Sequence, residues 1–319
     1  MKKHILHILI PALVLVSCSR WPEAMPSKQV ATVTLDSHTC SVRVGETWPL
    51  RVSFAPAGSS SIVIWASSDE SVATVSSTGT VTGVSAGSTK ISVSAGGKEA
   101  ECIVTVTAFK ELGIDVSKHQ GDINWTKVKA SGIDYVMLRI GYGQDIERKY
   151  ETKFEEYYDG AESVGMPMGV YCYSLAMTPE EAVAEAEFIV QRLEGRPLKL
   201  PVALDFESDK QRDNLTVAEK TEIIRSYKSV LESAGYDFIL YSNLTFIRDK
   251  IDQSLLSDED IDLWIARYRD ASLGTGYAGK GNVRMWQYSD KGLIDGILDD
   301  KGNYIYVDLD VTVGDELFA

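Results

Sequence analysis

From residue 110 onward, short apolar segments of strand length alternate with longer segments of helical periodicity. Strands are predicted at 112–116, 135–140, 168–173, 200–207 and 238–241, each followed by a helix-like segment. Such alternation is typical of a parallel sheet covered by helices. Three more strand-like segments follow at 262–266, 283–288 and 306–311, with glycine-rich loops between them. The pattern predicts an α/β fold, a TIM-like barrel of eight strands that lacks its last helices.

The predicted strand 200–207 ends in acidic residues. Side chains alternate across a strand, so the apolar residues share one face. Ala203, Asp205 and Glu207 share the other face, and the two acids lie at its C-terminal end. Two buried carboxylates close together raise at least one pKa, an arrangement typical of acid/base chemistry. The alternative is a structural pair neutralised by neighbouring cations.

Acidic residues recur at the same face of two other predicted strands. Asp115 lies between apolar neighbours in 112–116, and Asp308 and Asp310 do so in 306–311. We expect these acids near the C-terminal ends of their strands, where active sites of parallel barrels lie. Aromatic residues follow several of the same strands, and we interpret them as candidate platforms for sugar rings rather than core residues alone: Tyr173, Tyr241, Trp264 and Tyr268.

Residues 30–107 have a different pattern, with short alternating segments rich in Val, Thr and Ser. This pattern predicts a small all-β sandwich. Cys40 and Cys102 share the parity of apolar residues in the first and last predicted strands. We therefore predict a disulfide between them, the alternative being two buried thiols.

The N-terminus predicts export. Residues 1–17 combine a basic start with a short apolar segment that ends in Leu-Val-Ser before Cys18. This ending resembles the bacterial lipoprotein box, in which the cysteine is lipidated; the alternative is an ordinary signal peptide with an incidental cysteine. Residues 18–29 are polar and contain two prolines, as expected for a tether. We expect an exported protein anchored by lipid in the bacterial cell envelope, in the periplasm or at the outer membrane.

Charge and composition exclude several classes of function. The net charge of −14 argues against a nucleic-acid partner, which requires a basic face. Four dispersed cysteines and four histidines show no zinc spacing, so we expect neither a metal nor a cofactor.

Several motifs carry resemblances to known families. Residues 30–107 resemble the bacterial immunoglobulin-like group 2 domain, which serves as a spacer or adhesion module. Residues 110–319 resemble the lysozymes of glycoside hydrolase family 25 over nearly their whole length. The motifs for the second resemblance are Gly113-Ile114-Asp115-Val116-Ser117, Asp205-Phe206-Glu207, Tyr241-Ser242-Asn243, Leu263-Trp264-Ile265-Ala266-Arg267-Tyr268, Trp286-Gln287-Tyr288 and Val307-Asp308-Leu309-Asp310.

The resemblance implies a (β/α)5β3 barrel that cleaves the β-1,4 bond after N-acetylmuramic acid in peptidoglycan. It implies that Glu207 is the general acid/base, that Asp205 is its partner, and that Asp115 and Asp308 are supporting acids, with Asp308 favoured over Asp310. Substrate binding is expected from Tyr173, Tyr241, Trp264, Tyr268 and Gln287. We expect a monomer whose partners are peptidoglycan glycan strands and, through Cys18, a membrane.

Two other functions remain open at this point. One is a catalytically weak lipoprotein that binds the cell wall or mediates adhesion. The other keeps the chemistry but cleaves the N-acetylglucosaminyl bond, as an endo-N-acetylglucosaminidase or a chitinase-like hydrolase. Asp205 and Glu207 favour an active hydrolase, since a binding protein has no use for two adjacent buried carboxylates.

Overall fold

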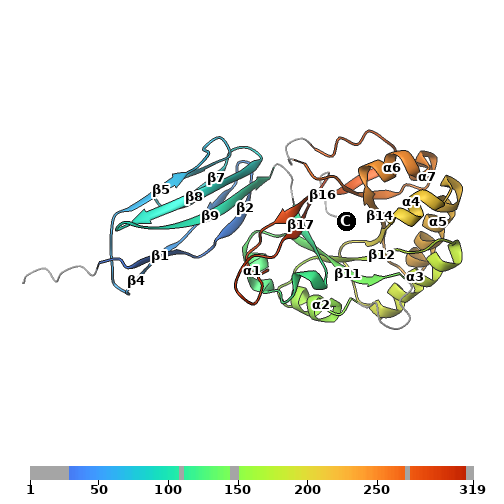
Figure 1. Ribbon diagram of the computed structural model, residues 1–319, viewed down its shortest axis with the longest axis horizontal. Coiled ribbons are helices and arrows are strands. Elements are labelled where there is room, and N and C mark those ends of the chain that lie inside the picture. The colour runs from blue at the N-terminus through green and yellow to red at the C-terminus, as the bar shows by residue number, and fades with distance from the viewer. Residues whose placement is uncertain (1–28, 108–110, 144–150, 270–273, 314–319) are drawn as a thin grey trace, which may run out of the picture.

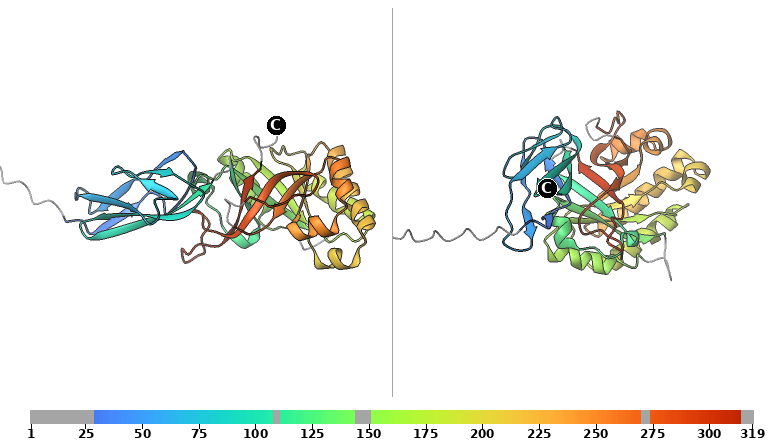
Figure 2. Two further views of the ribbon diagram at one scale, coloured as in Figure 1. Left: turned by 90° about the horizontal axis from the view of Figure 1, so that it is seen from above. Right: turned by 60° about the vertical axis from the view of Figure 1, so that its left-hand side comes forward.

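The computed structural model describes residues 29–107, 111–143, 151–269 and 274–313. The chain forms two parts that lie end to end, a small β-sandwich and a larger barrel (Figures 1 and 2). The proposed signal peptide, Cys18 and the tether lie outside the described residues. Among the helices of the described segments, none has the length and apolar composition needed to cross a membrane.

The sandwich is all-β, as predicted. A four-stranded sheet has the order β2-β9-β8-β5, a three-stranded sheet the order β3-β7-β6, and β1 pairs with β4. The short alternating segments at 41–44, 62–65, 72–75, 80–82, 90–93 and 103–106 correspond to β2 and β5 to β9, and the structure adds β1, β3 and β4. The bounds are β1 Thr32–Leu35, β2 Thr39–Arg43, β3 Thr47–Pro49, β4 Val52–Ala55, β5 Val63–Ser67, β6 Ala73–Val75, β7 Thr80–Gly83, β8 Gly87–Ala95 and β9 Lys98–Thr107.

Cys40 and Cys102 face each other in the buried core of the sandwich, but the structure holds them as free thiols rather than as the predicted disulfide. Their sulfur atoms are 3.9 Å apart, well beyond the S–S bond length of about 2.05 Å. Both cysteines lie in the core, as strand parity predicted, and the bond between them stays a prediction.

The second part is a closed barrel of eight strands, in chain order β10 to β17. Neighbouring strands from β10 to β16 are parallel, whereas β17 is antiparallel to both β16 and β10. The bounds are β10 Leu112–Val116, β11 Tyr135–Tyr142, β12 Met168–Tyr173, β13 Val202–Asp205, β14 Phe238–Asn243, β15 Asp262–Ala266, β16 Asn282–Gly292 and β17 Val307–Thr312.

The direction of β17 corrects one expectation. Asp308 lies near the N-terminal end of its strand, not the C-terminal end. Because β17 is antiparallel, that end lies at the same mouth of the barrel as the C-terminal ends of the other strands. Asp308 therefore still reaches the mouth, opposite Asp115 in the register, while Asp310 lies one layer deeper, opposite Gly113.

Helices follow β10 to β14 only, in the described part of the barrel. The structure contains two six-residue helices that the sequence pattern did not predict, α4 and α7. The bounds are α1 Trp125–Ala130, α2 Phe154–Ser163, α3 Pro179–Leu193, α4 Asp209–Asn214, α5 Val217–Ser233, α6 Leu244–Lys250 and α7 Gln253–Asp258, with a 3-10 turn at Lys118–Gln120. Most of these helices lie away from the sandwich, whereas β16, β17 and α1 lie beside it (Figure 1).

The barrel has an outer and an inner apolar cluster. The outer cluster joins the strands to the helices and includes Val202, Leu204 and Phe206, the apolar face predicted for this strand. The inner cluster fills the barrel and includes Ala203 and Trp264. Inward-facing side chains thus change from apolar in the middle of the barrel to acidic at its mouth.

Candidate active site

The strand register brings the predicted acids to one mouth of the barrel. Asp115 on β10 pairs directly with Asp308 on β17, so their side chains share the inner face. Asp205 ends β13 and lies in register with Tyr173 on β12 and Tyr241 on β14. Asp115 and Asp205 are 4% and 5% exposed, which makes this mouth a buried acidic site.

Glu207 lies just beyond β13, because the strand ends at Asp205 rather than at 207 as predicted. The backbone around it is fixed by three hydrogen bonds: Ser174 N donates to Asp205 O at 2.9 Å, Phe206 N donates to Tyr241 O at 2.9 Å, and the Ser242 hydroxyl donates to Phe206 O at 2.7 Å. The next residue, Ser208, caps α4 through a reciprocal capping box with Gln211. Glu207 is therefore held between a strand end and a capped helix.

Gln287 connects the aromatic residues to the acids. Its side-chain oxygen accepts hydrogen bonds from the hydroxyls of Tyr241, at 2.9 Å, and Tyr268, at 3.1 Å. Its amide nitrogen donates to Asp115 Oδ2 at 2.7 Å. These bonds fix the amide orientation and present its N–H to the carboxylate. Gln287 thus holds both the Asp115 carboxylate and the Tyr268 hydroxyl in place.

Trp264 does not fit the predicted role of a sugar platform. It is 1% exposed and packs against Tyr241 with ring centroids 4.5 Å apart. Its indole N–H donates to Asp310 Oδ1 at 2.8 Å, so the ring supports a buried carboxyl group instead. Tyr241, at 7% exposure, is enclosed in the same way.

Tyr268 and Tyr173 remain available as platforms. Tyr268 is 55% exposed, and Tyr173 is partly buried with its ring stacked on Tyr142, at a centroid distance of 4.8 Å and an interplanar angle of 4°. Exposed aromatic faces beside carboxyl groups are typical of carbohydrate sites. The sequence pattern identified the right strand ends but could not distinguish rings facing outward from rings packed inside the barrel.

The pKa values of the clustered acids are raised. Burial, followed by the charges of Asp115 and Asp209, raises the pKa of Glu207. Burial, followed by the charge of Glu207, raises the pKa of Asp205 well above its ordinary value. Burial also raises the pKa of Asp115 to about 6, opposed by the hydrogen bond from Gln287. Burial and mutual repulsion thus shift the acids at this mouth toward their protonated forms.

Asp308 and Asp310 differ in environment. Burial and the neighbouring charges of Asp115, Asp290 and Glu207 raise the pKa of Asp308 to about 8. Asp310 is fully buried, which raises its pKa well above the ordinary value despite the bond from Trp264. Asp308 is the member of the pair that lies at the mouth with the other acids.

One oxygen of Asp205 is left without a partner. Asp205 Oδ1 is buried and accepts no hydrogen bond from any described residue. A buried acceptor without a donor is costly, by about 1–3 kcal/mol for an ordinary polar group. The site therefore holds an acceptor ready for a donor from outside the protein.

Sequence reasoning missed one charged pair. Arg139 on β11 pairs with Glu151, with Nε to Oε2 at 2.5 Å, and Glu151 is 1% exposed. The positive charge of Arg139 opposes the rise in the pKa of both Asp205 and Asp115. Arg139, a cation at an inward position of an apolar strand, could have indicated a buried ion pair. Its partner Glu151 lies outside any strand or helix, so the strand pattern could not identify it.

Comparisons with known proteins agree with this geometry. The sequence profile of "Glycosyl hydrolases family 25" matches residues 114–297, and that of "Bacterial Ig-like domain (group 2)" matches residues 29–106. The chain is 27% identical over 187 residues to the autolytic lysozyme of Clostridium acetobutylicum, which covers 58% of this chain and 52% of the relative. The chain thus spans about half the length of that relative.

Two solved structures share the fold. The modular autolysin LytC from Streptococcus pneumoniae superposes with a TM-score of 0.56 at 22% identity, covering 76% of this chain and 56% of that one. The bacterial lysozyme from Streptomyces coelicolor has a TM-score of 0.53 at 20% identity, covering 64% of this chain and 92% of that one.

Proposed function

Because this chain belongs to glycosyl hydrolases family 25, we propose that it is a lysozyme-type N-acetylmuramidase that hydrolyses the β-1,4 bond between N-acetylmuramic acid and N-acetylglucosamine in peptidoglycan. The names of its relatives, an autolytic lysozyme and a modular autolysin, support this substrate. The barrel then corresponds to the (β/α)5β3 form, in agreement with helices after β10 to β14 and none described after β15 to β17.

The observation that carries the proposal is the pairing of two unlike carboxyl groups at the mouth. Burial and neighbouring acids raise the pKa of Glu207, which favours the protonated form that a general acid requires. Asp205 beside it has a buried oxygen without a donor. The N-acetyl group of the substrate offers an amide N–H that complements this oxygen.

We infer substrate-assisted catalysis from the closeness of these two residues, since Asp205 ends β13 and Glu207 follows two residues later. Glu207 protonates the glycosidic oxygen, the bond from that oxygen to the anomeric carbon breaks, and the carbonyl oxygen of the 2-acetamido group bonds to the anomeric carbon. Asp205 accepts the acetamide N–H and stabilises the positive charge that develops. The Glu207 carboxylate then removes a proton from water, whose oxygen attacks the anomeric carbon and displaces the acetamido oxygen, which restores the acetamido group. Two inversions give net retention.

The remaining acids have supporting roles in this proposal. The charge of Asp115 helps Glu207 to keep its proton, and Gln287 fixes the orientation of Asp115. Asp308, in register with Asp115 at the mouth, is the second supporting acid. Asp310 lies deeper and holds the indole of Trp264. Tyr173 and Tyr268 are the platforms for sugar rings.

The reducing end of the products tests the bond that is cleaved. Purified peptidoglycan is digested, the soluble products are reduced with borohydride, and their masses are determined. Reduced N-acetylmuramic acid is the expected result. Reduced N-acetylglucosamine would instead identify an endo-N-acetylglucosaminidase, and absence of soluble products would identify a protein that only binds the wall.

We also propose that Cys18 carries a lipid and that the protein is an exported, monomeric lipoprotein of the cell envelope. The lipoprotein box at Leu15-Val16-Ser17-Cys18 supports this anchor. Cys18→Ala should move the protein from the membrane to the soluble fraction without loss of hydrolysis, and a variant that still sediments with membranes would contradict the anchor.

A disulfide between Cys40 and Cys102 is proposed for the exported, oxidised protein. The sulfur separation of 3.9 Å in a buried core supports it, because bond formation requires little movement of either strand. Mass spectrometry of the folded, non-reduced protein tests the bond; two free thiols there would contradict it.

A further inference from the structure

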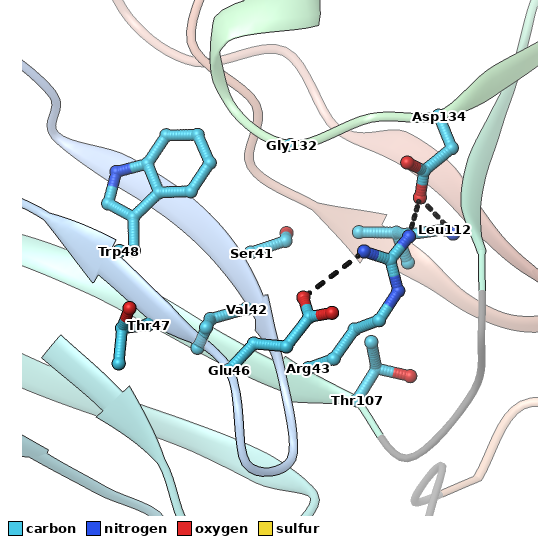
Figure 3. Close-up of a pocket in the computed structure, with 10 residues that line it drawn as sticks. All are labelled: Ser41, Val42, Arg43, Glu46, Thr47, Trp48, Thr107, Leu112, Gly132 and Asp134. Atoms are coloured by element: carbon cyan, nitrogen blue, oxygen red, sulfur yellow. Dashed lines mark hydrogen bonds and ion pairs between the residues drawn. The ribbon is translucent and has the colours of Figure 1, made fainter.

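The sandwich is joined to the barrel by two sets of polar contacts and by a hydrogen bond from Ser41 N to Ser131 O at 3.0 Å. In the first, Arg43 on β2 donates to Asp134, with Nη2 to Oδ2 at 2.8 Å, and also pairs with Glu46 at 3.3 Å. Asp134 Oδ2 accepts a further bond from Leu112 N at 2.8 Å, at the start of the first barrel strand (Figure 3). Because the same carboxylate binds both parts of the chain, this contact limits their relative rotation.

The second set involves the segment after β16. Asp295 Oδ2 accepts from His38 N at 2.9 Å, and Asp295 N donates to Thr39 Oγ1 at 3.1 Å. Gly132, at φ +84°, lets the barrel approach Ser41 closely, since a Cβ there would lie 2.8 Å from Ser41 O. The two sets of contacts fix the sandwich in one orientation on the barrel.

This orientation leaves an open cavity of about 450 Å³ between the two parts, in the size range of ligand sites. The barrel contributes Tyr268, Arg269 and the end of β16 at Ser289, Asp290 and Lys291. The sandwich contributes the adjacent ends of β8 and β9, including Ser88 and Thr105. Neither part forms this cavity alone.

The cavity lies beside the acidic mouth, with which it shares the Tyr268 side chain. Tyr268 lines it and donates through its hydroxyl to Gln287, which in turn donates to Asp115. Asp290 also lines it, and the charge of Asp290 contributes to the raised pKa of Asp308. A chain molecule bound at the mouth can therefore extend into the space between the two parts.

The lining has the chemistry of a saccharide site. Tyr268 offers an exposed aromatic face, and Ser88 and Thr105 bring hydroxyl groups within 3.4 Å of each other. Arg269 and Lys291 add cationic donors to the lining, which suit sugar oxygens. Asp290 supplies acceptors for sugar hydroxyls. Tyr288 also lines the cavity, and its hydroxyl lacks a partner in the described segments.

We propose that this cavity is an outer saccharide subsite, in which the immunoglobulin-like domain helps to bind the glycan strand whose bond is cleaved at the barrel mouth. The proposal rests on the muramidase function proposed above. It assigns the small domain a direct part in substrate binding, and it predicts that longer glycan strands are better substrates than short ones.

The test uses the full chain with peptide-free strands of alternating N-acetylglucosamine and N-acetylmuramic acid, a tetrasaccharide and a hexasaccharide. Ser88→Arg places a long side chain in the cavity from the exposed start of β8. Ser92→Arg is the matched control, on the same face of the same strand but about 13 Å farther along it. Thr105→Arg provides a second blocking variant, and melting curves establish that each variant is folded.

The measured quantity is the ratio of kcat/KM for the hexasaccharide to kcat/KM for the tetrasaccharide. We expect this ratio to exceed one in wild type and to be preserved in Ser92→Arg. Ser88→Arg and Thr105→Arg should each reduce the ratio about tenfold, which corresponds to the loss of one good sugar contact. An equal ratio in wild type and folded blocking variants would overturn the proposal, as would a length effect found only with peptide-bearing strands. Failure of the muramidase function itself is distinguishable, because wild type would then cleave neither strand.

Discussion

At the scale of single residues, the site depends on one proton held by Glu207. We expect Glu207→Gln to lose at least about 10²–10⁴-fold in kcat, the usual range for general acid catalysis, because an amide cannot protonate the leaving oxygen. The melting temperature should stay close to that of wild type, since glutamine keeps the shape of the side chain. Turnover near the wild-type rate would show that another acid donates the proton.

Asp209→Asn tests the pKa of Glu207, because Asp209 is an exposed carboxylate two residues further on. Its charge contributes to the raised pKa of Glu207, so its loss lowers that pKa. A general acid must be protonated, and the alkaline limb of kcat against pH should therefore move to lower pH in this variant. The movement should shrink at high salt, which screens an exposed charge. An unchanged limb at low salt would contradict the assignment.

Asp308 links activity to stability. Its folded pKa of about 8 is raised above that of an unfolded aspartate, so its contribution to stability is present at acid pH and is lost as pH rises toward 8. Asp308→Asn removes this loss. We expect the melting temperature of the variant minus that of wild type to become more positive from pH 4 to pH 8. The change should be about 2–4 °C for each kcal/mol of stability that wild type loses. The activity of the variant should be lower than that of wild type. A difference independent of pH would contradict the raised pKa.

At the scale of elements, a buried network holds the segment that carries Glu207. Glu185 on α3 is fully buried, and it accepts from the Ser174 hydroxyl at 2.6 Å and from Leu175 N at 2.9 Å. Gln211 on α4 donates to Ser174 Oγ at 3.3 Å and accepts from Ser208 N at 3.3 Å. The network therefore connects the end of β12 to the helix that begins directly after Glu207.

Loss of this network should destabilise the barrel. Glu185→Ala leaves two buried donors without an acceptor, at about 1–3 kcal/mol each, whereas Glu185→Gln keeps one acceptor oxygen and should cost less. Glu187→Ala, an exposed site on the same helix, is the control. The free energy of unfolding in urea ranks the three variants by their loss of stability. Equal values for all three would show that Glu185 does not hold this network together.

Strand parity predicted much of the architecture, because it is a local property. It correctly placed Asp115, Asp205 and Ala203 inside the barrel. The direction of β17 was not predictable in this way, since β17 closes the barrel between its neighbour β16 and the distant strand β10. The burial of Trp264 and the pair of Arg139 with Glu151 likewise depend on contacts between separate strands and loops, which no local pattern records.

At the scale of the whole molecule, the two parts have separate cores. The apolar cluster of the sandwich contains only residues before 107, and both barrel clusters contain only residues after 111. The contacts between the parts are mainly polar. A fragment of residues 109–319 should therefore fold and cleave the tetrasaccharide, but without preference for longer strands. A folded fragment without activity would mean that the sandwich belongs to the catalytic site.

The central claim is that the acetamido group of the substrate attacks the anomeric carbon beside Asp205. The most direct measurement is proton NMR of a soluble glycan during hydrolysis, read before the new reducing end mutarotates. Substrate assistance predicts that the first product carries the β anomer, through net retention. An initial α anomer would contradict the account and would require a supporting acid, Asp115 or Asp308, to activate water instead.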